Sequence, residues 1–150
     1  MGFGNATASL SPNCYSYVIG ENYSLDPGEK SNTSIEITDV ESVAKAVESD
    51  MKCYGYKIRR ISGYDAEIYD NEYRIALRTG KWEGIERIGD YHFMIQVNTG
   101  QWAEKHGKEG NTILWGHGWN PENIYWLYVN RDGKKYYYDS EIIYFAISKN

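Results

Sequence analysis

The sequence predicts an α+β fold in which two helices come first and an antiparallel β-sheet comes second. Apolar residues recur at helical spacing in the first third of the chain, whereas from residue 56 onward the pattern has a period of two and is rich in Ile and Tyr, with Val and Phe at a few positions. Helices and strands that are grouped rather than alternating are typical of this class. A chain of 150 residues is long enough for one core, so we expect residues 1–150 to form a single domain.

Two segments carry the signals of helices. The first helix is expected to begin after Asn13, a residue type that caps helices, and to stop at Gly20. The second is expected over residues 38–55, where Thr38 and Glu41 have the spacing of a capping box and apolar residues recur on one face.

The rest of the chain is typical of strands joined by turns. Residues 98–100 form a tight-turn sequence before the short run 101–105, and residues 130–133 predict a hairpin tip that returns through 136–138. The expected strands are 56–62, 73–80, 91–97, 124–129 and 141–148.

The composition argues against several kinds of partner. A formal charge of −5 and a pI near 5.2 are unsuited to a nucleic-acid surface, which needs an excess of Lys and Arg. No stretch approaches the roughly 18 apolar residues that a membrane span needs. The first ten residues lack the basic and apolar regions of a signal peptide, so we expect a cytoplasmic protein unless a dedicated secretion system exports it. The oligomeric state is left open.

The chain has two cysteines, Cys14 and Cys53, and nothing directs them to an oxidising compartment where a disulfide would persist. Zinc ligands typically come in close pairs, which two distant cysteines and three scattered histidines do not provide. We therefore expect no metal and no cofactor. Cys53, near the end of the second helix, is expected to be structural.

Cys14 differs from Cys53 because of its position. If Asn13 caps the first helix, Cys14 lies in the first turn, where unpaired N–H groups and the helix dipole favour a thiolate. A cysteine nucleophile needs such a depressed pKa and a neighbouring base. Free cysteines are also commonly buried and inert, so a packed core residue is the alternative.

The candidate base is His92, near the start of a predicted strand. Alternation places Tyr91 and Phe93 on one face of this strand, and His92 and Gln96 on the other. A histidine on a strand can equally be a surface residue or a satisfied core residue. His117 lies in a Gly-rich loop and is expected to shape a turn.

A set of short motifs in a fixed order resembles bacterial papain-like cysteine hydrolases. The set covers roughly residues 12–107 and consists of a helix start with Asn-Cys-Tyr-x-Tyr, a Pro-Gly pair, and a Tyr-His-Phe strand followed by Gln, a Gly turn and Trp. These pieces are Asn13-Cys14-Tyr15-Ser16-Tyr17, Pro27-Gly28, Tyr91-His92-Phe93, Gln96, Gly100 and Trp102.

The resemblance implies a papain-like fold with a thiolate–imidazolium pair, in which Cys14 is the nucleophile and His92 the base. It also implies a third polar residue that orients the imidazole from the following strand. The family pattern there is Trp-Ser-His-Lys, where this chain has Trp-Ala-Glu-Lys at 102–105, so the matching residue is Glu104. A carboxylate can accept the imidazole N–H and favour its charged form. His106, two residues on, is the fallback.

The oxyanion hole is less defined. The backbone N–H of Cys14 is a natural donor, and a side chain upstream, Asn13 or Asn5, could supply the second. Gln96 shares the face of His92, so it either lines the cleft or is an ordinary polar strand residue.

These features predict a cysteine hydrolase that cleaves an amide bond in a protein or peptide substrate. A peptide or isopeptide bond, the stem peptide of a cell wall or a Gln side chain could be the target, and an amine in place of water would give acyl transfer. The alternatives are a non-catalytic papain-like binding module with an aromatic groove, and a structural protein whose Cys and His only pack. The groove would be lined by Trp102, Trp115, Trp119 and Trp126.

Overall fold

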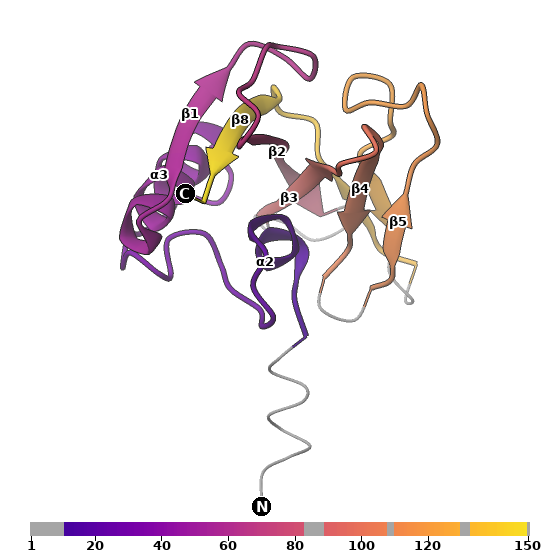
Figure 1. Ribbon diagram of the computed structural model, residues 1–150. Coiled ribbons are helices and arrows are strands. Elements are labelled where there is room, and N and C mark those ends of the chain that lie inside the picture. Colours follow the sequence, from indigo (N-terminus) through magenta and orange to yellow (C-terminus); the bar gives the residue numbers. More distant parts are fainter. Residues whose placement is uncertain (1–10, 83–88, 108–109, 130–132, 150) are drawn as a thin grey trace, which may run out of the picture.

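The computed structural model describes residues 11–82, 89–107, 110–129 and 133–149. Asn5 and residues 130–132 of the expected hairpin tip lie outside these ranges. In the described part of the chain, two helices pack on one antiparallel sheet (Figure 1), which confirms the predicted α+β class. Within these ranges, no helix combines the length and apolar character that crossing a membrane requires.

The first helix, α2 (Cys14–Ile19), begins and ends where its sequence predicts. Asn13 Oδ1 accepts a hydrogen bond from the Ser16 N–H at 2.9 Å, and the Ser16 hydroxyl accepts one from the Asn13 N–H at 2.8 Å. Gly20 ends the helix at a φ of 82°, in the left-handed region that favours glycine.

The second helix, α3 (Val40–Tyr54), is capped by Asp39 rather than by Thr38. Asp39 Oδ1 accepts from the Glu41 N–H at 3.1 Å, whereas the Thr38 hydroxyl donates to the Glu36 carboxylate at 3.1 Å. The predicted capping box of Thr38 and Glu41 is therefore wrong. Thr and Asp are both good caps, and adjacent candidates cannot be separated by residue type alone.

The sheet has the strand order β1-β8-β2-β3-β4-β5, with β7 pairing with β2, and β6 with β7. All of these pairs are antiparallel. The C-terminal strand β8 lies between β1 and β2 (Figure 1). The strands are β1 (Lys57–Ile61), β2 (Tyr73–Trp82), β3 (Gly89–Gln96), β4 (Trp102–Lys105), β5 (Thr112–Leu114), β6 (Leu127–Val129), β7 (Lys135–Tyr137) and β8 (Ile143–Ser148).

The strands β1, β2, β3 and β8 match expected segments to within two residues at each end. The strand expected at 124–129 is shortened to β6, because Ile124 and Trp126 turn into the core and the Trp126 indole N–H donates to the Pro121 carbonyl oxygen at 2.8 Å. No expected strand corresponds to β5, whose three side chains are all exposed and therefore carry no alternating signal.

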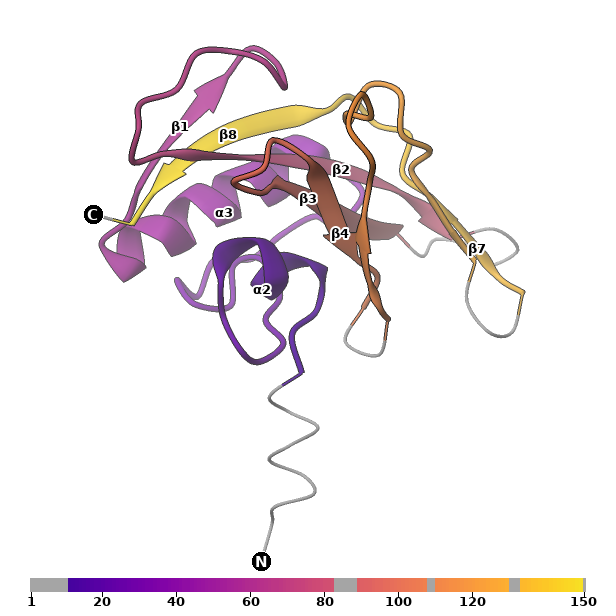
Figure 2. The ribbon, with the colours of Figure 1, turned by 45° about the vertical axis from the view of Figure 1, so that its right-hand side comes forward.

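The two faces of the sheet carry different clusters. Both helices cover one face (Figure 2), where their apolar side chains meet Leu77 of β2 and Phe93 of β3. The opposite face carries a second cluster that includes Met94, Trp126 and Tyr138. Successive residues of β3 thus point to opposite faces, as the alternation of its sequence predicts.

A buried carboxylate fastens the loop that follows α2. Asp50 of α3 accepts hydrogen bonds from the Tyr15 hydroxyl at 2.7 Å and from the Gly28 N–H at 2.8 Å. The same loop carries Asp26, which accepts a hydrogen bond from the Tyr91 hydroxyl at 2.5 Å. These contacts tie α2, its loop and the start of β3 together around Cys14.

Candidate active site

Cys14 is the first residue of α2, and only 6% of it is exposed. It belongs to the apolar cluster on the helix-covered face of the sheet. Its Sγ lies 3.9 Å from the carbonyl oxygen of Tyr91 on β3, a weak contact for a thiol donor. The helix start therefore places the thiol against the first residues of β3.

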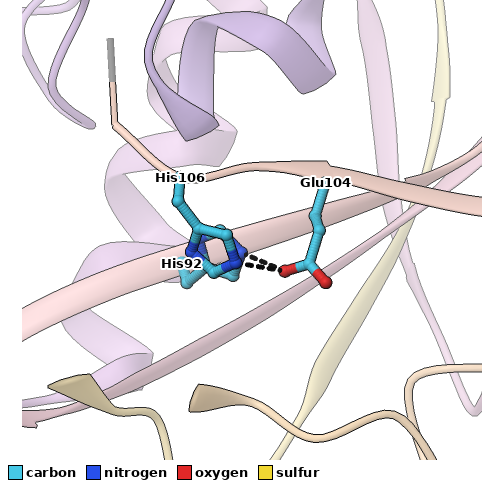
Figure 3. Close-up of side chains that lie close together, drawn as sticks. All are labelled: His92, Glu104 and His106. Atoms are coloured by element: carbon cyan, nitrogen blue, oxygen red, sulfur yellow. Dashed lines mark hydrogen bonds and ion pairs between the residues drawn. The ribbon is translucent and has the colours of Figure 1, made fainter. Parts of the chain in front are cut away.

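His92 of β3 and Glu104 of β4 form a buried pair, with His92 Nε2 2.7 Å from Glu104 Oε1. The register pairs Glu104 with Met94, so both project from the same face of the sheet, and His92 follows that face by alternation. Figure 3 shows the imidazole and the carboxylate pointing toward each other. The structure thus brings together the two residues that the sequence placed in the roles of base and orienting group.

Three N–H donors hold the Glu104 carboxylate. His92 and His106 both donate through Nε2 to Oε1, at 2.7 and 3.0 Å (Figure 3), and the Trp115 indole donates to Oε2 at 2.6 Å. Burial raises the pKa of Glu104, but the hydrogen bonds from His106 and His92 outweigh it and hold the pKa at about 2. Glu104 is therefore ionised at neutral pH and acts only as an acceptor.

His92 is neutral at rest. Burial lowers its pKa, and this effect outweighs the hydrogen bond to Glu104 that favours the charged form. Because Glu104 can only accept, the single proton of the neutral imidazole lies on Nε2, and Nδ1 is left as an acceptor. This is the tautomer that a general base requires.

His106, the fallback for the third residue, lies beside His92 instead of replacing Glu104. The two imidazoles are stacked, with centroids 4.3 Å apart and planes within 4°, and His106 also stacks on Tyr128 at 4.5 Å. Ligand atoms of His92, Glu104 and His106 all lie within 4.8 Å of one another, a spacing that could suit a metal. A metal bonds an imidazole nitrogen close to the plane of its ring, so a shared ion would require one of the two parallel rings to turn. In the arrangement observed, both ring nitrogens contact the Glu104 carboxylate instead.

A cavity of about 190 Å³ is lined by Cys14 and His92 together, and also by His106. The last residue pair of the β3–β4 ladder is Met94 and Glu104. His92 comes two residues before Met94 and His106 two residues after Glu104, so the cavity lies just beyond this end of the ladder. Cys14 reaches this opening from the helix-covered face. Within the described part of the chain, no hydrogen bond joins its thiol to His92.

The expected depressed pKa of Cys14 is not found. Burial raises the pKa of this thiol well above its ordinary value, and the charge of Asp90 adds to the effect. Backbone hydrogen bonds from Phe93 and Tyr15 lower it only in part. The resting residue is therefore a neutral thiol, because tertiary packing outweighs the effect expected from the helix start.

Asn13 lines the cavity, but its side chain is engaged elsewhere. Its Oδ1 accepts from the Ser16 N–H, and its Nδ2 donates to the Leu25 carbonyl oxygen at 2.7 Å. Asn13 thus caps α2 and fixes the following loop, which leaves the Cys14 backbone N–H as the better predicted oxyanion donor.

Gln96 is not part of the cavity wall. Its Oε1 accepts from Arg74 at 2.7 Å, and its Nε2 donates to the Gly100 carbonyl oxygen at 3.0 Å. Gln96 shares the sheet face of His92 but lies four residues away, or about 14 Å along an extended strand. Of the two alternatives left open for Gln96, the structure favours the ordinary polar strand residue, because the strand carries its side chain too far from His92 to line this cavity.

The four tryptophans do not line an open groove, although Trp115 packs against the cluster that holds Trp102 and Trp126 and its ring lies 5.4 Å from that of Trp119. Trp102 and Trp126 are buried in the cluster on the second face, Trp115 is half-buried against Glu104, and Trp119 is exposed. The aromatic residues instead build the walls around the histidines.

The sequence did not predict the roles of three residues that shape this site: Tyr138 and Asp90 were not site candidates, and Trp115 was expected only in an aromatic groove. Trp115 donates to Glu104, Tyr138 stacks on His92 at 5.1 Å, and Asp90 accepts from the Tyr138 hydroxyl at 2.8 Å. Trp115 and Tyr138 come from segments that only the strand pairing brings close. Only Asp90 lies close to His92 in the sequence, two residues before it, and could have been considered from the sequence alone.

No family model, no curated protein and no solved structure matches this chain.

Proposed function

We propose that the protein is a cysteine-dependent hydrolase that cleaves an amide bond in a protein or peptide substrate. Cys14 is the nucleophile, His92 the base and Glu104 the group that orients the imidazole. The observation that carries this proposal is a single cavity lined by a cysteine and by a histidine whose far nitrogen is fixed by a buried carboxylate.

The raised pKa of Cys14 and the lowered pKa of His92 favour a pair that is neutral at rest. The ion pair expected from the sequence then forms only during reaction. As Sγ attacks the carbonyl carbon, its proton passes to His92 Nδ1, and the Glu104 carboxylate stabilises the imidazolium that forms. His106 and Tyr138, which both stack on the His92 ring, limit its rotation.

The remaining steps follow from the same groups. The imidazolium returns its proton to the leaving nitrogen as the C–N bond breaks, which leaves a thioester on Cys14. His92 then takes a proton from water, the water oxygen attacks the thioester carbon, and the Cys14 sulfur leaves and regains its proton. A peptide, an isopeptide or a Gln side chain fits this chemistry.

A specific observation favours a second candidate, the non-catalytic binding module. The Cys14 thiol is buried, has a raised pKa and contacts a backbone carbonyl rather than the imidazole. An inert core cysteine would have these properties.

Turnover assays on wild-type protein and matched variants separate the two candidates. Labelled casein reports cleavage of peptide bonds, ammonia release from glutamine peptides reports deamidation, and p-nitrophenyl acetate reports acylation of a nucleophile. We expect turnover of at least one substrate, and a loss of at least about 100-fold in Cys14→Ser and His92→Ala.

Cys53→Ser is the matched control, because it makes the same substitution at the exposed cysteine of α3. We expect it to keep full activity. If wild-type protein and Cys14→Ser hydrolyse each of the three substrates at the same rate, Cys14 is not the nucleophile and the binding module is favoured.

A further inference from the structure

A second cavity lies next to the histidines and has no part in the chemistry proposed above. Its volume is about 330 Å³, and Arg78, Trp126 and Tyr138 are among its lining residues. Tyr138 also lines the cavity that contains Cys14, so the two cavities share a wall.

Arg78 of β2 is directly opposite His92 of β3 in the sheet register. Residues paired in this way project from the same face, with Cα atoms about 4.5–5.5 Å apart. Trp126 contacts both, since its ring meets His92 edge-on at 5.8 Å and its centroid lies 5.6 Å from the guanidinium carbon of Arg78. A group bound by Arg78 is therefore held beside the proposed base.

The Arg78 guanidinium is held at one end by a hydrogen bond, and its other end has no hydrogen-bond partner among the described residues, although the charges of Asp139 and Glu122 act on it. Its Nε–H donates to the Ser140 carbonyl oxygen at 2.7 Å, which sets its direction. Among the described residues, neither Nη atom has a hydrogen-bond partner and no carboxylate is close enough for an ion pair. Arg74 on the same strand differs, because its Nε and both Nη atoms are bonded to the Ala66 carbonyl oxygen and the Gln96 side chain.

A half-buried guanidinium with both Nη groups available is suited to a carboxylate, whose two oxygens match the planar fork. Partial burial excludes part of the water that would compete for these donors. The exposed residues Glu122 and Asp139 also line the cavity. Glu122 Oε2 already accepts from the Tyr144 hydroxyl at 2.6 Å, so its other oxygen and the Asp139 carboxylate are the acceptors for a backbone N–H. The C-terminal residue of a peptide offers both groups, because its Cα carries the carboxylate and also the backbone N–H.

We propose that the Arg78 cavity binds the C-terminal carboxylate of a peptide substrate and so directs the hydrolase to bonds near that end. The inference rests on the proposed function, because it names the substrate of that site. The exposed ring of Tyr125, also in the cavity wall, is available to the side chain of the terminal residue. A Glu or Asp side chain is the other source of a carboxylate.

Binding is measured first, in a Cys14→Ser background that cannot turn over the ligand. Calorimetry compares N-acetyl-trialanine with a free carboxylate, the same peptide as its C-terminal amide, and an amidated peptide whose only carboxylate is a Glu side chain. We expect the free acid to bind about 10- to 100-fold more tightly than the amide, and Arg78→Gln to remove this difference.

Arg78→Lys keeps the charge without the fork, and we expect it to retain part of the preference. Arg59→Gln is the matched control, since Arg59 lies on the edge strand β1 and pairs with Glu72 outside the cavity. We expect it to bind all three peptides as wild type does. If Arg78→Gln does not fold, loss of part of the preference in Arg78→Lys tests the same claim.

Equal binding of the free acid and the amide, or an unchanged preference in Arg78→Lys and Arg78→Gln, would overturn the proposal. Tighter binding of the Glu side-chain peptide would overturn the assignment to a chain terminus. Hydrolysis by wild type with no dependence on a terminal carboxylate would defeat this inference alone. Selective binding of the free acid by a protein that hydrolyses nothing would defeat the proposed function and leave the carboxylate site in place.

Discussion

The substitution Glu104→Gln tests how much the buried cluster of Glu104, His92 and His106 contributes to stability. A carboxyl whose pKa is about 2 in the folded protein, against an ordinary value of 4.5, contributes about 3 kcal/mol to the free energy of unfolding at neutral pH. The Gln side chain removes the charge, and its NH₂ group cannot accept from a donor such as Trp115. An unpaired buried donor adds about 1–3 kcal/mol. We therefore expect Glu104→Gln to be at least about 3 kcal/mol less stable than wild type at pH 7.

The pH dependence gives a second readout of the same residue. Because the pKa of Glu104 is depressed on folding, its contribution is present above pH 4.5 and is lost as the pH falls toward 2. Urea unfolding between pH 5 and pH 2 should show a loss in wild type that Glu104→Gln lacks. Glu41→Gln, which removes an exposed partner of Arg60, is the control and should cost about 0–1 kcal/mol. A variant within about 1 kcal/mol of wild type, with the wild-type pH profile, would refute the reasoning about Glu104.

Two further substitutions test the surroundings of the site. Asp90→Asn removes a negative charge that raises the pKa of Cys14, so alkylation of Cys14 by iodoacetamide at pH 8 should become faster, while alkylation of Cys53 stays constant. Peptide mapping measures both rates, and an unchanged ratio between them would contradict this prediction. Gly28→Ala places a Cβ 2.0 Å from the backbone oxygen of Thr33 at a φ of 93°, whereas Gly118→Ala has a φ of 95° and open space around its Cβ. Gly28→Ala should therefore lower the midpoint of urea unfolding far more than Gly118→Ala does. Similar midpoints would show that the loop around Gly28 moves freely.

The sequence was most informative where local rules decide the outcome. Alternation along β3 placed His92 and Phe93 on opposite faces, and Asn13 and Gly20 marked the ends of α2. The resemblance to the family pattern at residues 102–105 implied Glu104 as the partner of His92, and the structure places the two side chains in contact.

What the sequence could not supply depends on distant segments. The helix start of Cys14 argued for a low pKa, but the packing of α2 on β3 and the nearby charge of Asp90 reverse that direction. Trp115 and Tyr138 reach the histidines only through the pairing of β4 with β5 and of β2 with β7. Gln96 was assigned to the correct face, but face alone does not say how far along a strand a residue lies.

The central claim is that Cys14 reacts through His92 although its thiol is neutral at rest, and the ratio of Cys14 to Cys53 modification tests it most directly. Peptide mapping by mass spectrometry would measure both sites in one sample, with iodoacetamide and with p-nitrophenyl acetate. Alkylation needs a thiolate, so the exposed Cys53 should react faster with iodoacetamide. Acylation gains from a positioned base, so Cys14 should react faster with the ester, and this advantage should disappear in His92→Ala. A Cys14 that is slower than Cys53 with both reagents, and indifferent to His92, would contradict the account and identify Cys14 as a core residue.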